Sequence, residues 1–141
     1  MFERIIFLDI DGVLVVRPTD GEFSPGAVGI LREIVVASGA KIVISSAWRR
    51  CSTWRSNILK AFRAAGWNDP PIVGRTSVMS GGRGEEISAW LKVHPAKSIL
   101  IIDDIDIEFS EEQKKRLIHC DEYAGLKEEH IQLAAEKWAA Q

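Results

Sequence analysis

The residues best suited to chemistry lie near the start of the chain, where Asp9 and Asp11 follow the apolar run Ile5-Ile6-Phe7-Leu8. If the backbone stays extended through Asp11, both carboxylates lean toward the same side of the strand end. Carboxylates held this close repel each other, unless a divalent cation neutralises them or one of them carries a proton. Such a pair can do chemistry, because one carboxylate can act as a nucleophile while the other transfers a proton.

Two further apolar segments also run directly into polar residues. Lys41 to Ile44 is followed by Ser45 and Ser46, and Ser98 to Ile102 is followed by Asp103 and Asp104. Mg²⁺ prefers hard oxygen ligands and keeps several of its waters, so a few carboxylates at the ends of separate strands suffice to bind it. We therefore expect the acidic residues of the first and third segments to converge on one hydrated Mg²⁺ ion that also binds a phosphoryl group.

The elements that must position these residues can be predicted from hydrophobic patterning. The apolar segments lack polar alternation, which is typical of strands covered on both faces. Strands are expected at residues 5–8, 41–45, 72–74, 98–102 and 117–120, and helices from Ser24-Pro25 to Gly39 and at residues 53–65, 85–93 and 128–140. Between the first strand and the first helix, Pro18 and an Asp20-Gly21 turn signal predict a small hairpin or flap.

Strands that alternate with helices of this length form parallel sheets with right-handed crossovers. We therefore expect an α/β fold with three layers, a Rossmann-like parallel sheet with helices on both faces. In such sheets ligands bind outside the carboxyl ends of the strands, near the point where the strand order reverses. The polar residues that end the strands are thus the candidates for a functional site.

The composition is that of one globular domain spanning residues 1–141, with 46% hydrophobic and 27% charged residues. A formal net charge of -2 gives no global case for a nucleic-acid or membrane-surface protein. No apolar stretch approaches the roughly 20 residues that span a bilayer, and the apolar run near the start of the chain, broken by Asp9 and Asp11, is too short and too acidic for a signal peptide. Cys51 and Cys120 match no metal-binding or redox pair, so we expect a reduced, cytoplasmic protein.

Four segments, in this order, resemble the motifs of haloacid-dehalogenase-like (HAD) phosphatases. They are Asp9-Ile10-Asp11-Gly12-Val13-Leu14, Lys41 to Ser46, Gly82-Arg83-Gly84-Glu85-Glu86-Ile87 and the pair Asp103-Asp104. The resemblance extends from residue 5 to about residue 106. It implies a magnesium-dependent phosphomonoester hydrolase that works through an aspartyl-phosphate intermediate. Within the superfamily, residues 44–49 and 83–87 look closest to a small group found beside RNA-repair modules.

The family pattern implies a role for each matching residue. Asp9 would be the nucleophile and a metal ligand, and Asp11 the general acid/base, with its backbone carbonyl on the metal. A second acid at this position resembles the phosphatases, since the dehalogenase branch lacks it. Ser45 and Arg83 would stabilise charge on the transferring phosphoryl group. Arg83 departs from the more common lysine, and an arginine can bind phosphate bidentately but cannot give up its proton.

The metal ligands that the resemblance implies are Asp9, Asp11, Asp103 and Asp104. Asp104 is the first choice for the direct ligand of the last motif, with Asp103 bound directly or through water. Further candidates for substrate binding are Gly12, Ser46 and Arg49. Ser46 is also an alternative to Ser45 as the phosphoryl-binding hydroxyl.

The short connections leave no space for a separate cap domain, so the expected site is open. An open site admits the end of a macromolecule, or it depends on a partner subunit, as in a homodimer, to cover a small ligand. The stretch from Trp48 to Arg63 has five basic residues and no acidic one: Arg49, Arg50, Arg55, Lys60 and Arg63. Trp48 and Trp54 are available there to stack on bases, which indicates a local nucleic-acid surface.

Three functions fit these observations. The first is a phosphatase acting on a phosphorylated small molecule or macromolecular end. The second is a nucleic-acid end-processing 3′- or 5′-phosphatase in RNA or DNA repair. The third is a regulatory module that binds phosphate without turnover, against which the intact pair Asp9 and Asp11 argues, because a purely binding site has no evident need for a general acid.

Overall fold

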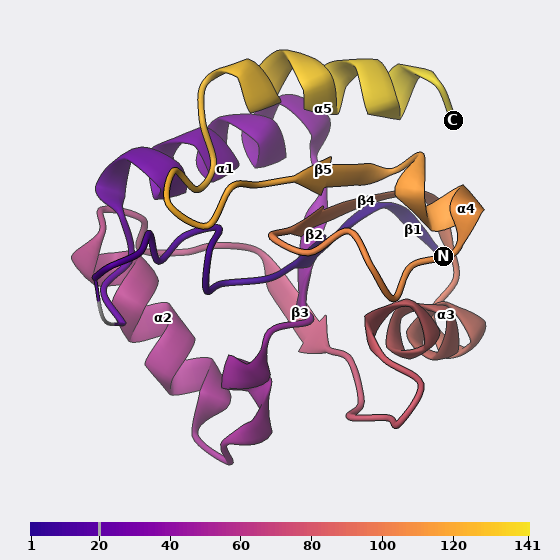
Figure 1. Cartoon of the computed structure of the whole chain (residues 1–141), viewed down its shortest axis with the longest axis horizontal. Coiled ribbons are helices and arrows are strands. Elements are labelled where there is room, and N and C mark those ends of the chain that lie inside the picture. The colour runs from indigo at the N-terminus through magenta and orange to yellow at the C-terminus, as the bar shows by residue number, and fades with distance from the viewer. Residues whose placement is uncertain (20) are drawn as a thin grey trace.

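The computed structural model describes residues 1–19 and 21–141, which contain a five-stranded parallel sheet (Figure 1). The strands are β1 (Phe2–Leu8), β2 (Lys41–Ile44), β3 (Ile72–Arg75), β4 (Ala96–Asp103) and β5 (Leu117–His119). They lie in the order β3-β2-β1-β4-β5, so the chain moves outward from β1 to β3 and then returns to the other side of β1. The strand order therefore reverses between β1 and β4, which is where ligands bind in sheets of this kind.

Helices cover both faces of the sheet (Figure 1). One face packs against α1 (Pro25–Ser38), α2 (Trp54–Ala64) and α5 (Glu129–Ala139), and the other against α3 (Arg83–Val93), beside which lies α4 (Glu111–Lys114). Side chains of β1 alternate between the two cores: Ile6 and Leu8 belong to the first, and Ile5 and Phe7 to the second. The expected three-layer α/β fold is thus confirmed. None of the described helices has the length and apolar character needed to cross a membrane.

The ends of α1 form as the sequence predicts. The Ser24 side chain accepts a hydrogen bond from the Ala27 N–H at 3.2 Å, with proline in the first helical position. Gly39 ends the helix with φ +70°, a left-handed conformation that favours glycine. The short helices were not expected: the four-residue α4 and the 3-10 helix η1 (Ala47–Arg50), which directly follows β2. Helix α3 begins at Arg83, two residues earlier than predicted.

The segment between β1 and α1 differs from the expected hairpin. The Ile10 carbonyl accepts backbone N–H bonds from three residues, Val13, Leu14 and Val15, which closes a compact turn directly after Asp9. Among the described residues of this segment the only strand-like pairing is one bridge between Asp11 and Val15. Asp20, half of the expected turn signal, lies outside the described residues. The described part is therefore a loop of turns, and no cap domain is inserted in it.

Candidate active site

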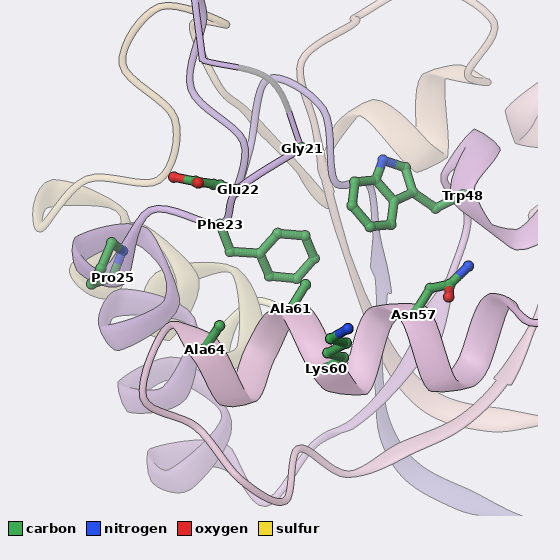
Figure 2. A pocket seen from close by; sticks show the side chains of 9 residues that line it. All are labelled: Gly21, Glu22, Phe23, Pro25, Trp48, Asn57, Lys60, Ala61 and Ala64. Atoms are coloured by element: carbon green, nitrogen blue, oxygen red, sulfur yellow. The ribbon is translucent and has the colours of Figure 1, made fainter.

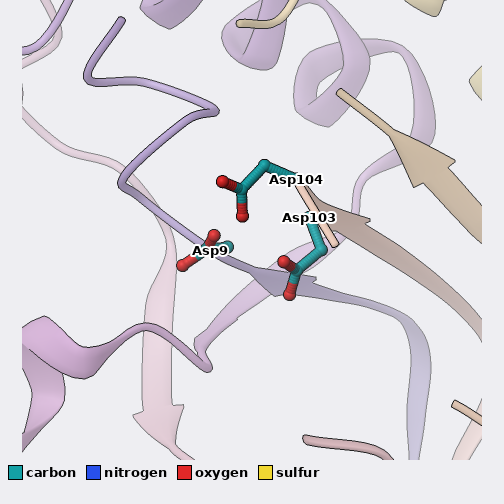
Figure 3. A group of neighbouring side chains, drawn as sticks. All are labelled: Asp9, Asp103 and Asp104. Carbon is teal, nitrogen blue, oxygen red and sulfur yellow. The ribbon is translucent and has the colours of Figure 1, made fainter. Parts of the chain in front are cut away.

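Three carboxylates meet at the switch point between β1 and β4 (Figure 3). Asp9 follows β1, Asp103 ends β4 and Asp104 comes next, and one oxygen of each lies within 4.8 Å of the others. The sheet itself fixes their spacing, because the Asp9 N–H continues the ladder to the Ile102 carbonyl at 3.0 Å. Asp9 is 2% exposed and Asp103 0%, so both carboxylates are held away from water. The fold thus brings together acids from the two expected segments.

Gly12 allows the close packing around this acidic cluster. Its φ is +84°, and a Cβ added at this position would overlap the carboxylate of Asp104. Its N–H donates to the Val15 carbonyl at 2.8 Å and so belongs to the tight turn. A residue expected to bind substrate therefore lies against a candidate metal ligand, where only glycine fits without displacing Asp104.

Asp11 lies outside the group of three carboxylates. Its side chain is exposed and its Oδ2 accepts a hydrogen bond from the Trp48 Nε1–H at 3.2 Å. The two acids of the first motif therefore differ in position and exposure. Asp9 faces the cluster, whereas the Asp11 carboxylate is oriented by a residue of η1 and reaches solvent, as a group that exchanges protons must.

Arg83 lies directly on the acidic cluster. Its Nη1 is 3.1 Å from Oδ1 of Asp9 and 2.6 Å from Oδ2 of Asp103. If all three carboxylates were ionised, the single guanidinium would leave an excess of two negative charges at a largely buried position. Either protonation of a carboxyl or a bound divalent cation would relieve this charge.

Two contacts anchor the start of α3 and thereby the position of Arg83. The Arg83 N–H donates to the Glu108 carboxylate at 3.1 Å, and Nε2 of Gln113 donates to the Gly84 carbonyl at 2.9 Å. Gln113 also closes the capping box of α4. Because both acceptor and donor come from the segment after β4, the arginine and the acids of that strand are held as one unit.

Burial sets the electrostatics of the cluster. Burial, followed by repulsion from Asp103, raises the pKa of Asp9 from 3.8 to about 8, although Arg83 opposes the shift. Burial also raises the pKa of Asp103, again against the effect of Arg83. For Arg83, burial disfavours the charged form, but attraction to Asp9 and Asp103 outweighs it and raises the pKa, so the guanidinium stays charged. A set of hard, negatively charged oxygens with too little positive charge fits a Mg²⁺ ion.

The two serines after β2 have different surroundings. Ser46 caps η1, because its Oγ accepts the Trp48 N–H at 3.2 Å. Ser45 continues the hydrogen-bond ladder with β1, because its N–H donates to the Leu8 carbonyl at 2.9 Å. The residue is 1% exposed. Its Oγ has no hydrogen-bond partner among the described residues. A buried hydroxyl without a partner costs free energy, which a bound phosphoryl oxygen would recover.

Arg49, which was expected to bind substrate, is a buried structural residue instead. It is 3% exposed, and its guanidinium donates to three carbonyls and one carboxylate: those of Thr76 (3.0 Å), Ser45 (3.1 Å), Ser46 (2.8 Å) and Glu86 (2.8 Å). The expectation that it binds substrate is therefore not supported by this geometry. Its contacts instead fix the backbone that carries the Ser45 hydroxyl.

Glu86, the partner of Arg49, was not identified from the sequence. Its carboxylate is buried and also accepts the Met79 N–H at 2.8 Å. A signal was present, because Glu86 precedes Ile87 and stands four residues before Trp90, which places it on the inward face of the helix. A charged residue on that face requires a buried partner of opposite charge.

The other basic residues between Trp48 and Arg63, which are Arg50, Arg55, Lys60 and Arg63, are exposed. Arg55 donates to the Ile72 carbonyl at 2.8 Å, and the guanidinium groups of Arg55 and Arg75 lie 5.9 and 5.3 Å from the Trp54 ring centre. Trp54 is therefore covered by arginines of the chain itself. Trp48 and Lys60 both line a cavity beside α2.

Comparison with known proteins gives one match. The model of the family described as the HAD domain in Swiss Army Knife RNA repair proteins matches residues 5–131. No curated protein and no solved structure matches the chain. The matched range is most of the chain and includes the acidic cluster, Ser45 and Arg83, in agreement with the resemblance of the motifs. The chain therefore belongs to the family of HAD domains found in Swiss Army Knife RNA repair proteins.

Proposed function

We propose that this protein is a Mg²⁺-dependent phosphomonoester hydrolase in which Asp9 is the nucleophile. The observation that carries the proposal is the convergence of the buried Asp9 and Asp103 with the half-buried Asp104 beside Arg83, a group of oxygens that a divalent cation would hold in the ionised form. The ion would be held by these three carboxylates and by the Asp11 backbone carbonyl. When bound, Mg²⁺ supplies positive charge that neutralises the phosphoryl oxygens and the carboxylates around them.

The first half of the reaction forms an aspartyl-phosphate. A carboxylate oxygen of Asp9 attacks phosphorus, the bond from phosphorus to the ester oxygen breaks, and Asp11 gives its proton to that leaving oxygen. In the second half Asp11 takes a proton from water, and the water oxygen attacks phosphorus. The bond to Asp9 then breaks, which releases inorganic phosphate and regenerates the free carboxylate.

The residues around Asp9 support this sequence of steps. Arg83 opposes the rise in the pKa of Asp9 and so favours the ionised nucleophile. The same guanidinium and the Ser45 hydroxyl are available to donate to phosphoryl oxygens as charge shifts onto them. The indole of Trp48 orients the Asp11 carboxylate for proton transfer.

The proposal is tested by hydrolysis of an aryl phosphate with and without Mg²⁺. Asp9→Asn keeps the shape of the side chain but removes the nucleophile, so we expect kcat/KM to fall at least about 10³-fold. Asp69→Asn, the same change at an exposed aspartate in the loop after α2, is the matched control and should keep wild-type activity. Wild-type turnover in Asp9→Asn, or turnover that chelation of Mg²⁺ does not reduce, would contradict the proposal.

A second candidate, hydrolysis of phosphates at nucleic-acid ends, is favoured by the family match and by the open site without a cap. Oligonucleotides with a terminal 3′- or 5′-phosphate should then compete with the aryl phosphate, and the competition should weaken steeply as the salt concentration rises. Competition by small sugar phosphates that exceeds that by the oligonucleotides would favour a metabolite phosphatase instead.

A further inference from the structure

A cavity of about 560 Å³ lies between the loop that precedes α1 and the exposed side of α2 (Figure 2). The lining residues from the loop and η1 include Phe23 and Trp48, and those from α2 include Asn57, Lys60 and Ala61. Figure 2 shows the two aromatic rings above the helix, with Ala61 and Lys60 facing them from below. The volume is in the range of pockets that bind ligands of nucleotide size.

The cavity is joined to the catalytic centre in two ways. The indole of Trp48 forms part of its wall, while the Nε1–H of the same ring donates to Asp11 at 3.2 Å. Gly21 lines both this cavity and a neighbouring depression that contains Asp11 and Gly12. A substrate whose phosphate lies at Asp9 and whose leaving group passes Asp11 is thereby directed into the cavity.

The lining has the chemistry of a site for a flat, mostly apolar group with a polar edge. Trp48 and Phe23 lie 5.4 Å apart between ring centres, at 56°, and Ala61 adds a methyl group. Asn57 and Lys60 on α2 are exposed at the rim and supply an amide and a cation, and the exposed Glu22 of the loop adds a carboxylate to the lining. Among the described residues no carboxylate forms an ion pair with Lys60.

We propose that this cavity binds the nucleobase of the terminal nucleotide whose phosphate is hydrolysed at Asp9. The base packs against Trp48, and Lys60 contacts the backbone phosphate of the next nucleotide in the strand. This inference rests on the proposed phosphatase function. A phosphopeptide fits less well, because an aromatic residue would fill the apolar wall but would bring no second phosphate for Lys60.

The test compares kcat/KM for three substrates: a short oligoribonucleotide with a terminal phosphate, the same strand with an abasic terminal residue, and an aryl phosphate. We expect the normal strand to exceed the abasic one by about tenfold, the size of one base stacked on an aromatic ring. Two variants address the cavity. Lys60→Glu reverses the exposed charge, and Ala61→Phe fills the space beneath the rings.

Both variants should lower the ratio of kcat/KM for the oligoribonucleotide to that for the aryl phosphate by about tenfold or more. Lys92→Glu, the same charge reversal on α3 across the sheet, is the control and should leave the ratio unchanged. A mononucleotide distinguishes a free nucleotide from the end of a strand as the source of the base. Its kcat/KM should fall in Ala61→Phe but not in Lys60→Glu, because it has no second phosphate.

Equal rates for normal and abasic strands, or an unchanged ratio in both variants, would overturn the proposal. If Ala61→Phe lowers kcat/KM more for a phosphotyrosine peptide than for the oligoribonucleotide, the cavity binds a peptide side chain and not a nucleobase. If the wild type hydrolyses none of the substrates, the hydrolase proposal fails separately. Binding of a labelled oligoribonucleotide, with and without the terminal base, then still decides by fluorescence anisotropy whether the cavity holds a base.

Discussion

Two arginines of this protein meet buried carboxylates in opposite ways. Arg49 faces the single carboxylate of Glu86, and its remaining donors are taken by backbone carbonyls. Arg83 faces two carboxylates, Asp9 and Asp103, with a third close by. The first arrangement is balanced in charge and complete in hydrogen bonds. The second has excess negative charge and a guanidinium that is still partly open to solvent.

The difference separates residues that hold the site together from residues that we propose react. A balanced buried pair gains nothing from a ligand, so the Arg49 pair is suited to fixing η1 against α3. An unbalanced group is stabilised by whatever brings positive charge, so the acidic cluster is suited to bind a cation and then a phosphate. Burial of a charged residue therefore does not indicate function unless its charge balance is known.

The largest expected effect on stability comes from breaking the balanced pair. Glu86→Gln leaves the Arg49 guanidinium buried beside a neutral partner, and we expect the free energy of unfolding to fall by about 3–5 kcal/mol. Asp9→Asn should lower it far less in the metal-free protein, because burial holds the Asp9 carboxyl largely protonated below its pKa of about 8, so the change removes little charge. Chemical denaturation of both variants measures the contrast.

The double variant Arg49→Met with Glu86→Leu serves as the control for this contrast. Because it removes both charges together, it should recover most of the stability lost in Glu86→Gln. A Glu86→Gln protein as stable as the wild type would show that the pair does not hold η1 and α3 together.

A smaller effect is expected at Ser45, whose hydroxyl belongs to the reacting side. Ser45→Ala should lower kcat about 10- to 100-fold, because one donor to the phosphoryl oxygens is lost. Stability should be unchanged or slightly higher, since the hydroxyl makes no hydrogen bond within the described residues. Ser46→Ala is the matched control: it removes the cap of η1 and should affect stability more than kcat. The reverse pattern would assign the phosphoryl contact to Ser46.

The smallest and most graded effect concerns pH. The pKa of Asp9 is about 8 in the folded, metal-free protein and 3.8 when unperturbed, so folding favours the protonated carboxyl. The contribution of the protonated Asp9 carboxyl to the free energy of unfolding is complete below pH 3.8 and is lost as the pH rises to about 8. Mg²⁺ needs the ionised form, so its affinity should rise up to tenfold per pH unit between about pH 6 and pH 8 and then level off. Calorimetric titration of Mg²⁺ at several pH values measures the slope, which Asp9→Asn should abolish.

The sequence was informative where neighbours along the chain decide the structure. Apolar runs predicted all five strands, and the acids that end two of them pointed to the switch point before any contact was known. Ser24 and Gly39 predicted the limits of α1 in the same way. Parallel strands bring their carboxyl ends to one edge, so residues far apart in the sequence could be placed together.

The sequence was uninformative where a partner lies far along the chain. Arg49 stands among other basic residues and looks like a surface charge, and its partner Glu86 follows 37 positions later. The contact from Trp48 to Asp11 spans the same separation, so the orientation of the Asp11 carboxylate could not be predicted. The sequence predicted a hairpin or a flap, and the described residues form a loop of turns without a hairpin, because the Ile10 carbonyl accepts three N–H groups and closes a turn that no short sequence motif predicts.

The anchoring of α3 by Gln113 limits which segments of this protein can be exchanged with those of a relative. Its side chain joins the Gly84 carbonyl and the Ser88 hydroxyl to the capping box of α4, and a Cβ at position 84 would collide with both Gln113 and the Glu108 carbonyl. Residues 82–88 and 108–113 are thus two halves of one interlocking piece. A chimera that exchanges one half with a relative should inherit a displaced arginine, whereas one that exchanges both should inherit a working centre.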